Sequence, residues 1–135
     1  MSKATDSQVD GNHYSKLKIQ PMQLAYSINA SPCFMNVCKY ITREKDAVFI
    51  QLNKAKHCID LEEELIGEYA LYGDELDMGG QAVPVKYYEK ITAFADQFEY
   101  STLIAAILLY VHDRQYDMAR HQLRLFKMEA LKDEK

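Results

Sequence analysis

The chain has 135 residues, of which 48% are hydrophobic and 27% are charged, and its formal net charge is −4. This composition is that of a globular domain and excludes a disordered segment, and a chain of this length buries roughly two-thirds of its unfolded surface. The acidic balance excludes general coating of DNA or RNA, which requires a basic face. One compact domain is expected.

The charge is distributed unevenly along the chain. Residues 1–67 carry eight basic and eight acidic residues, whereas residues 68–99 carry seven acidic and two basic residues, a local charge of −5. Because like charges repel, an anionic ligand is expected against the first half of the chain.

Cysteine usage and hydropathy indicate a cytoplasmic protein. Cys33, Cys38 and Cys58 have no paired spacing, which predicts free thiols in a reducing compartment. The first twenty residues are polar, so no signal peptide is expected. The most apolar run, 103–111, is shorter than the about 20 residues that span a bilayer. It predicts a buried helix and no contact with a membrane.

Helix signals divide the first half into three elements. Residues 1–12 are polar and are expected to form a mobile arm. A short helix is predicted over 21–29, because proline is favoured in a first helical turn. Ser31-Pro32 predicts the start of a second helix. Its apolar residues recur at the spacing of one helix face, at Phe34, Val37, Cys38 and Ile41.

A long third helix and a linker follow. Asp46 can cap this helix, and an apolar face with a spacing of three to four residues continues from Val48 to Gly67. Residues 67–83 combine four glycines with several acidic residues, which predicts a linker.

The second half, residues 84–135, predicts three more helices. Pro84 can open the first, Ser101 can cap the apolar second, and the third covers about 114–131. The first of these helices carries an apolar face at Tyr88, Ile91, Ala95 and Phe98. No useful β-alternation is present, so the predicted fold is all-α: a small bundle of helical hairpins in which 1–66 and 84–135 form one compact domain.

The two halves share a loose pattern. Each has an apolar helix that ends in a tyrosine, a short polar break and a long amphipathic helix, so that Lys39-Tyr40-Ile41 would correspond to Leu109-Tyr110-Val111. Chance similarity between amphipathic helices is the favoured interpretation, and an internal repeat is the alternative.

A polar stripe in the first half is the main candidate site. Asn36, Lys39, Tyr40 and Arg43 have the same four offsets as the neighbouring apolar face. Two cations with an amide and a phenol between them can hold a phosphate by charge-assisted hydrogen bonds. Tyr40 could also stack on a ring. The alternative is a solvated helix face paired to the glutamates 62–64.

Other residues could complete this site. His13 and Tyr14 could fold over a ligand, with the imidazole bonding phosphate or acting as an acid or base; the alternative is an N-terminal anchor. Lys54 could add a third positive charge if the two long helices pack antiparallel; the alternative is a solvated lysine. No P-loop motif is present, which excludes a P-loop enzyme.

The ordered set of these motifs resembles a small phage-encoded family described as nucleotide-kinase-like, after an early phage enzyme that phosphorylates deoxynucleoside monophosphates without a P-loop. The resemblance covers about residues 9–66. It is carried by His13-Tyr14, Gln20-Pro21, Asn36, Lys39-Tyr40, Arg43, Lys45, Leu52 and Lys54-Ala55. It implies a nucleotide or phosphate site formed by His13, Tyr14, Asn36, Lys39, Tyr40 and Arg43, with Lys45 and Lys54 nearby.

The chain departs from this family at two places. Gln51 stands where the family usually has an aspartate, and the family's late aromatic residue falls near Cys58. The part of the chain from Gly67 onward has no counterpart in the resemblance.

Two functions follow from the resemblance. One is a non-P-loop nucleoside monophosphate kinase that uses Mg²⁺ held mostly by the phosphates, although Gln51 weakens this hypothesis. The favoured one is a phage early protein in the host-cell cytoplasm that binds a nucleotide or a host protein without turnover, since related proteins are linked to sensitivity to abortive-infection systems. No metal site of its own is predicted, and a homo-oligomer, with a dimer favoured, is expected.

Overall fold

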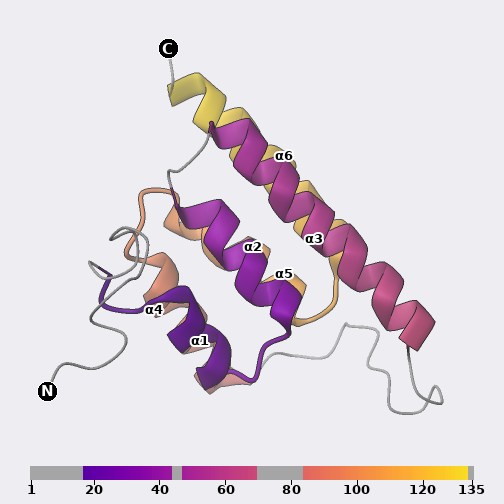
Figure 1. The fold of residues 1–135 in the computed structure, drawn as a ribbon. Helices are drawn as coiled ribbons and strands as arrows, with labels where there is room; N and C mark the ends of the chain where they lie inside the picture. The colour runs from indigo at the N-terminus through magenta and orange to yellow at the C-terminus, as the bar shows by residue number, and fades with distance from the viewer. Residues whose placement is uncertain (1–16, 44–46, 70–83, 134–135) are drawn as a thin grey trace, which may run out of the picture.

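The structure, a computed structural model, describes residues 17–43, 47–69 and 84–133 (Figure 1). These residues form six helices and, within the described ranges, no strand, which confirms the predicted all-α bundle of hairpins. None of the described helices is long and apolar enough to cross a membrane. The helices are α1 (Pro21–Ser27), α2 (Pro32–Thr42), α3 (Val48–Tyr69), α4 (Val85–Ala95), α5 (Ser101–His112) and α6 (Tyr116–Asp133).

Local signals set the helix starts. α1 begins with Pro21, and the backbone N–H of Gln20 donates to Oε1 of Gln23 at 2.7 Å. Ser31 caps α2, since its Oγ accepts a hydrogen bond from the backbone N–H of Phe34 at 3.1 Å. Pro84 directly precedes α4, as predicted. The starts that contain proline were therefore predicted correctly.

Several predicted boundaries differ from the structure. Ser101 is the first residue of α5 and does not cap it. Phe98 was predicted on α4, but that helix ends at Ala95 and Phe98 lies in the following turn. α3 continues through Gly67 to Tyr69, three residues into the predicted linker. Asp46 and the rest of that linker lie outside the described residues.

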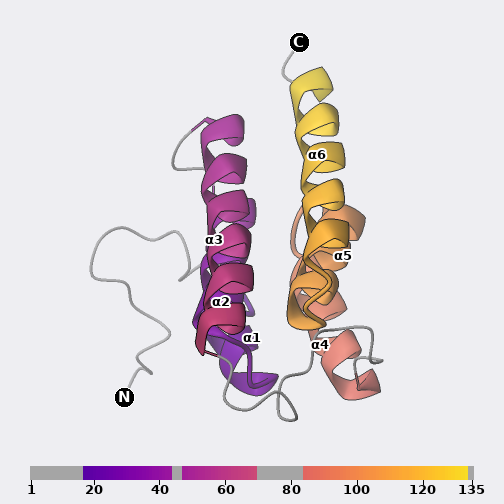
Figure 2. The same cartoon turned by 90° about the vertical axis from the view of Figure 1, so that its right-hand side faces the viewer.

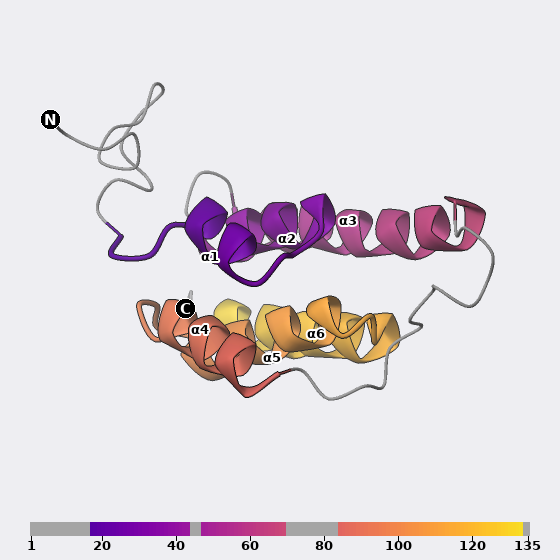
Figure 3. The same cartoon turned by 90° about the horizontal axis from the view of Figure 1, so that it is seen from below.

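The six helices form two layers of three. Figure 3 shows α1, α2 and α3 in one layer and α4, α5 and α6 in the other, and Figure 2 shows the same separation from the side. Each helix of one layer packs against its counterpart in the other: α1 on α4, α2 on α5 and α3 on α6. The buried residues of both halves form one core.

The buried positions of the two layers have the same register. In α2 the buried residues are Phe34, Val37, Cys38 and Ile41, and in α5 they are Ile104, Ile107, Leu108 and Val111, each 70 positions later. α1 and α4 share this offset, whereas the buried positions of α3 and α6 differ by 64, because the α5–α6 turn is two residues shorter and α6 begins at the counterpart of Leu52, four residues into α3. The loose pattern noted in the sequence thus corresponds to a repeat of structure.

Polar contacts fasten the layers together at their edges. The side chain of Gln97 accepts from the backbone N–H of Ile19 at 3.0 Å and donates to its carbonyl at 2.9 Å. Arg120 on α6 donates to Asp60 at 2.7 Å and to Glu63 at 2.5 Å, both on α3. Neutral contacts therefore fix the α1–α4 end, and ion pairs fix α3 to α6.

Replacement of Ile107 by alanine is expected to destabilise the fold by about 2–5 kcal/mol, because the side chain is fully buried between the layers and a cavity would remain. The loss would be measured by urea unfolding. Met22→Ala is the control, since Met22 is 55% exposed and should lower the free energy of unfolding little. Equal losses in the two variants would contradict the two-layer core.

Candidate functional site

Tyr40 is the centre of a cationic cluster at the corner where α2 leads into α3. The guanidinium carbon of Arg43 lies 5.4 Å from the centroid of the Tyr40 ring, and Nζ of Lys54 lies 5.8 Å from it. Both distances are within the range of cation–π contacts. Lys54 reaches the ring because α2 and α3 form an antiparallel hairpin (Figure 1). Three of the predicted site residues are thus brought together.

A cavity of about 340 Å³ lies beside this cluster, between the α2–α3 corner of one layer and the α4–α5 turn of the other. This volume is at the lower end of the range for sites that hold one small ligand. The first layer contributes Tyr40, Ile41, Thr42, Arg43, Ala47, Val48, Gln51 and Leu52, and the second contributes Phe98, Glu99, Tyr100, Ile104 and Phe126.

Two buried polar atoms in this wall lack a hydrogen-bond partner among the described residues: Nε of Arg43 and Oε1 of Gln51. Gln51 is only 3% exposed, and its Nε2 donates to the carbonyl of Arg43 at 3.2 Å. An unsatisfied buried polar group costs about 1–3 kcal/mol of stability.

The opposite wall comes from the second half of the chain. Tyr100 donates a hydrogen bond to the carboxylate of Asp133 at the end of α6, and its ring centroid lies 5.0 Å from that of Phe126. The hydrogen bond to Asp133, and then burial, raises the pKa of Tyr100 to about 12, so its phenol stays protonated at neutral pH. Glu99, beside it, adds one carboxylate to the cavity.

The other predicted residues are placed differently. Asn36 and Lys39 are half-buried on α2 but do not line the cavity, and Lys54 contacts the Tyr40 ring without lining the cavity. His13, Tyr14 and Lys45 lie outside the described residues.

The sequence alternative, in which the stripe pairs with the glutamates of α3, is wrong for Glu62 and Glu63. Glu62 accepts a hydrogen bond from the hydroxyl of Tyr116 at 2.9 Å, and Glu63 pairs with Arg120. Both partners are on α6, so these two carboxylates are directed to the layer interface and not to the stripe.

Sequence reasoning missed the wall formed by Phe98, Glu99, Tyr100 and Phe126. These residues follow the cationic cluster by more than forty positions, and helical periodicity does not show which helices pack together. The weak repeat is the one signal that could have found them, because it predicts how two equivalent units face each other. Gln51 was noted only as a departure from a family pattern.

The second layer provides an internal comparison for the stripe. The counterpart of each stripe residue lies 70 positions later in the sequence. There the second layer retains the tyrosine, as Tyr110, but carries no cation at the other stripe positions. The same helix therefore folds without the polar residues of the stripe, which indicates that they are not required by the fold. The replacements are Ala106 for Asn36, Leu109 for Lys39, Asp113 for Arg43 and, at offset 64, Met118 for Lys54.

The three cysteines are free and do not form a nucleophilic site. Burial is the largest cause that raises the pKa of Cys33, Cys38 and Cys58. The Cys33 thiol donates to the carbonyl of Cys58 at 2.9 Å, which joins α2 to α3. A thiol with a raised pKa forms little thiolate, so these residues are structural.

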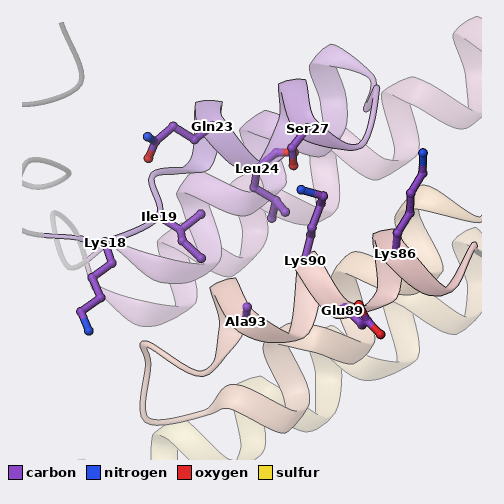
Figure 4. A pocket seen from close by; sticks show the side chains of 9 residues that line it. All are labelled: Lys18, Ile19, Gln23, Leu24, Ser27, Lys86, Glu89, Lys90 and Ala93. Atoms are coloured by element: carbon purple, nitrogen blue, oxygen red, sulfur yellow. The ribbon is translucent and has the colours of Figure 1, made fainter. Parts of the chain in front are cut away.

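A second hollow of about 430 Å³ lies between α1 and α4 (Figure 4). Lys18, Lys86 and Lys90 are spread along it, and Lys90 extends from α4 toward α1. Its polar side chains already have backbone partners: Gln23 accepts from the N–H of Gln20, and Ser27 donates to the carbonyl of Leu24. This hollow has positive charge but lacks the convergence of aromatic rings and unsatisfied buried atoms found beside Tyr40.

No family model, curated protein or solved structure matches this chain. Within the described ranges, no group of three or more histidine, cysteine, aspartate or glutamate side chains is placed to hold a metal ion. The chemistry of the site therefore rests on its own residues: two cations on a phenol ring, a buried amide, a carboxylate and an aromatic wall.

Gln51→Leu is expected to change the free energy of unfolding by no more than about 1 kcal/mol, because the lost hydrogen bond is offset by removal of the unsatisfied oxygen. Urea unfolding would measure the change.

Gln97→Leu is the matched control. The Gln97 side chain makes three hydrogen bonds to the backbone of Ile19 and Phe94, so its replacement should cost more than that of Gln51. An equal loss in the two variants would show that Oε1 of Gln51 is already satisfied.

Proposed function

We propose that this chain binds a nucleotide, or a related small phosphate ester, in the cavity beside Tyr40, and that it does so without turnover. The observation that carries the proposal is the convergence of two cations on the Tyr40 ring, beside a cavity that Arg43 lines and that aromatic side chains close on the far side. Arg43 and Gln51 each also keep a buried polar atom without a partner among the described residues, and native proteins leave few such atoms unsatisfied.

The two walls of the cavity suit the two parts of a nucleotide. Arg43 can hold a phosphate with charge-assisted bonds while Lys54 adds positive charge at the same ring. Phe98, Tyr100 and Phe126 provide flat apolar surfaces on the other side for a base or sugar. The internal comparison supports this assignment, because the equivalent helix of the second layer lacks these cations.

The proposed setting follows from the resemblance of residues 9–66 to phage nucleotide-kinase-like proteins. On this basis we propose a phage early protein that acts in the host-cell cytoplasm and is sensed by an abortive-infection system. Contact with a host protein is a second proposed role. The exposed apolar side chains of α1 and α4 support it, above all Tyr26, which is 83% exposed, and Val85.

A nucleoside monophosphate kinase is the alternative activity. Glu99 favours it, because this carboxylate lines the same cavity as Arg43 and could orient a substrate hydroxyl or a water bound to Mg²⁺. The volume of the cavity opposes it, since a kinase must hold a phosphate donor and an acceptor together and about 340 Å³ suits one small ligand.

Thermal melting with nucleotides tests the proposed binding. A ligand at 100 times its Kd stabilises the native state by about 2.7 kcal/mol, which raises Tm by several degrees. Deoxynucleoside mono-, di- and triphosphates would each be added with and without Mg²⁺. Arg43→Ala should abolish the rise in Tm, because it removes the cation that lines the cavity.

The control for this experiment is Lys90→Ala, which removes a positive charge from the hollow between α1 and α4. It should leave the rise in Tm unchanged. A rise that survives Arg43→Ala but is lost in Lys90→Ala would move the site to that hollow. No rise with any nucleotide would refute nucleotide binding.

A turnover assay separates binding from catalysis. With ATP, Mg²⁺ and each deoxynucleoside monophosphate, no ADP release above the background is expected, because the cavity lacks room for both nucleotides. ADP release that disappears in Glu99→Gln, while the rise in Tm persists, would establish the kinase alternative.

A further inference from the structure

The two layers place two equivalent corners in the molecule. One is the α2–α3 corner of the first layer against the α4–α5 turn, and the other is the α5–α6 corner of the second layer against the turn after α1. The equivalence follows from the shared register of buried residues and from the pairing of each helix with its counterpart. Yet the side chains at the two corners differ in chemistry.

At the first corner the lining residues surround a cavity. Thr42 of α2 faces it together with Phe98 and Ile104 of the second layer, and Leu52 and Phe126 close it from the two long helices. Arg43 and Gln51 contribute the polar atoms without partners. This corner is the proposed ligand site.

At the second corner the equivalent residues contact one another. His112 replaces Thr42; its Nε2 lies 3.1 Å from the carbonyl oxygen of Ile28, and its ring packs edge-on against Phe34 at 5.9 Å. Ile28 and Phe34 are the counterparts of Phe98 and Ile104, and both are fully buried.

The long helices fill the second corner further. Tyr116 replaces Leu52 and donates to Glu62, which replaces Phe126, at 2.9 Å. Glu62 is only 7% exposed, so this hydrogen-bonded pair lies in the interior. The charge is reversed as well, because Asp113 stands where Arg43 stands in the first corner. The carboxylate of Glu62 in the interior opposes an anion.

We propose that the chain contains two copies of one three-helix unit, that only the corner carrying Arg43 takes the phosphate ligand, and that Glu62 and Tyr116 close the equivalent corner. The second unit thus supplies Glu99, Tyr100 and Phe126 as the far wall of the first unit's site and has no site of its own. The number of ligands rests on the proposed function, whereas the duplication does not.

Equilibrium binding counts the sites. Isothermal titration calorimetry would be run on the full chain with each deoxynucleoside monophosphate and with inorganic phosphate. It should give one site per chain. Arg43→Ala should remove it, and Asp113→Asn should leave both the affinity and the count unchanged. Two sites per chain, or a site that Asp113→Asn abolishes, would overturn the proposal while leaving ligand binding itself intact.

A second experiment tests the equivalence of the corners without any ligand. Glu62→Phe and Tyr116→Leu each place the residue of the first corner at the second. Either change alone leaves a polar partner buried without its hydrogen bond, so each should lower Tm by several degrees. The double variant recreates the apolar pair of the first corner and should recover most of that loss.

The double variant decides the duplication whatever the titration shows. A loss in Tm equal to or greater than the sum of the two single losses, or failure of the double variant to fold, would overturn the equivalence of the corners. If no probe binds while the double variant recovers its Tm, the proposed function fails and the duplication stands.

Discussion

The packing of α2 against α5 is the constraint on which the rest of the structure depends. Each presents the same four-residue apolar face, and each face covers the other at the centre of the molecule. Because two equivalent helices meet across this contact, their connected elements also meet in pairs, α1 with α4 and α3 with α6. The corner after α2 must then face the turn before α5. The cavity beside Tyr40 follows from this arrangement, because the helices and turns of the two layers form all of its lining among the described residues.

The helices could be predicted from sequence because their signals are local. Proline and serine set the starts of α1, α2 and α4, and apolar spacing set their buried faces. Half of the site was also predictable, because Tyr40, Arg43 and Lys54 belong to one hairpin. The other half was not, because Glu99 and Phe126 reach the cavity only through contacts between layers, and periodicity within a helix does not encode such contacts. Ser101 was misassigned because the helix begins without a side-chain cap.

Three acidic residues of α3 contact α6 at the layer interface. Arg120 of α6 forms ion pairs with Asp60 and Glu63, and the hydroxyl of Tyr116 donates a hydrogen bond to Glu62. Although burial opposes it, hydrogen bonds from Lys56 and Arg120 lower the pKa of Asp60, so this carboxylate stays ionised for that contact. The layer interface therefore uses three of the carboxylates of α3.

The comparison between the two units separates what the fold needs from what a ligand needs. The tyrosine and the glutamine occur in both units, as Tyr40 with Tyr110 and Gln51 with Gln115. Gln51 donates to the backbone of residue 43, and Gln115 donates to the side chain of its counterpart, Asp113. The glutamine thus fastens the helix corner in each unit, whatever the charge there. The cations at these positions occur only in the first unit, so Arg43 and Lys54, more than the ring between them, account for the difference in charge between the two corners.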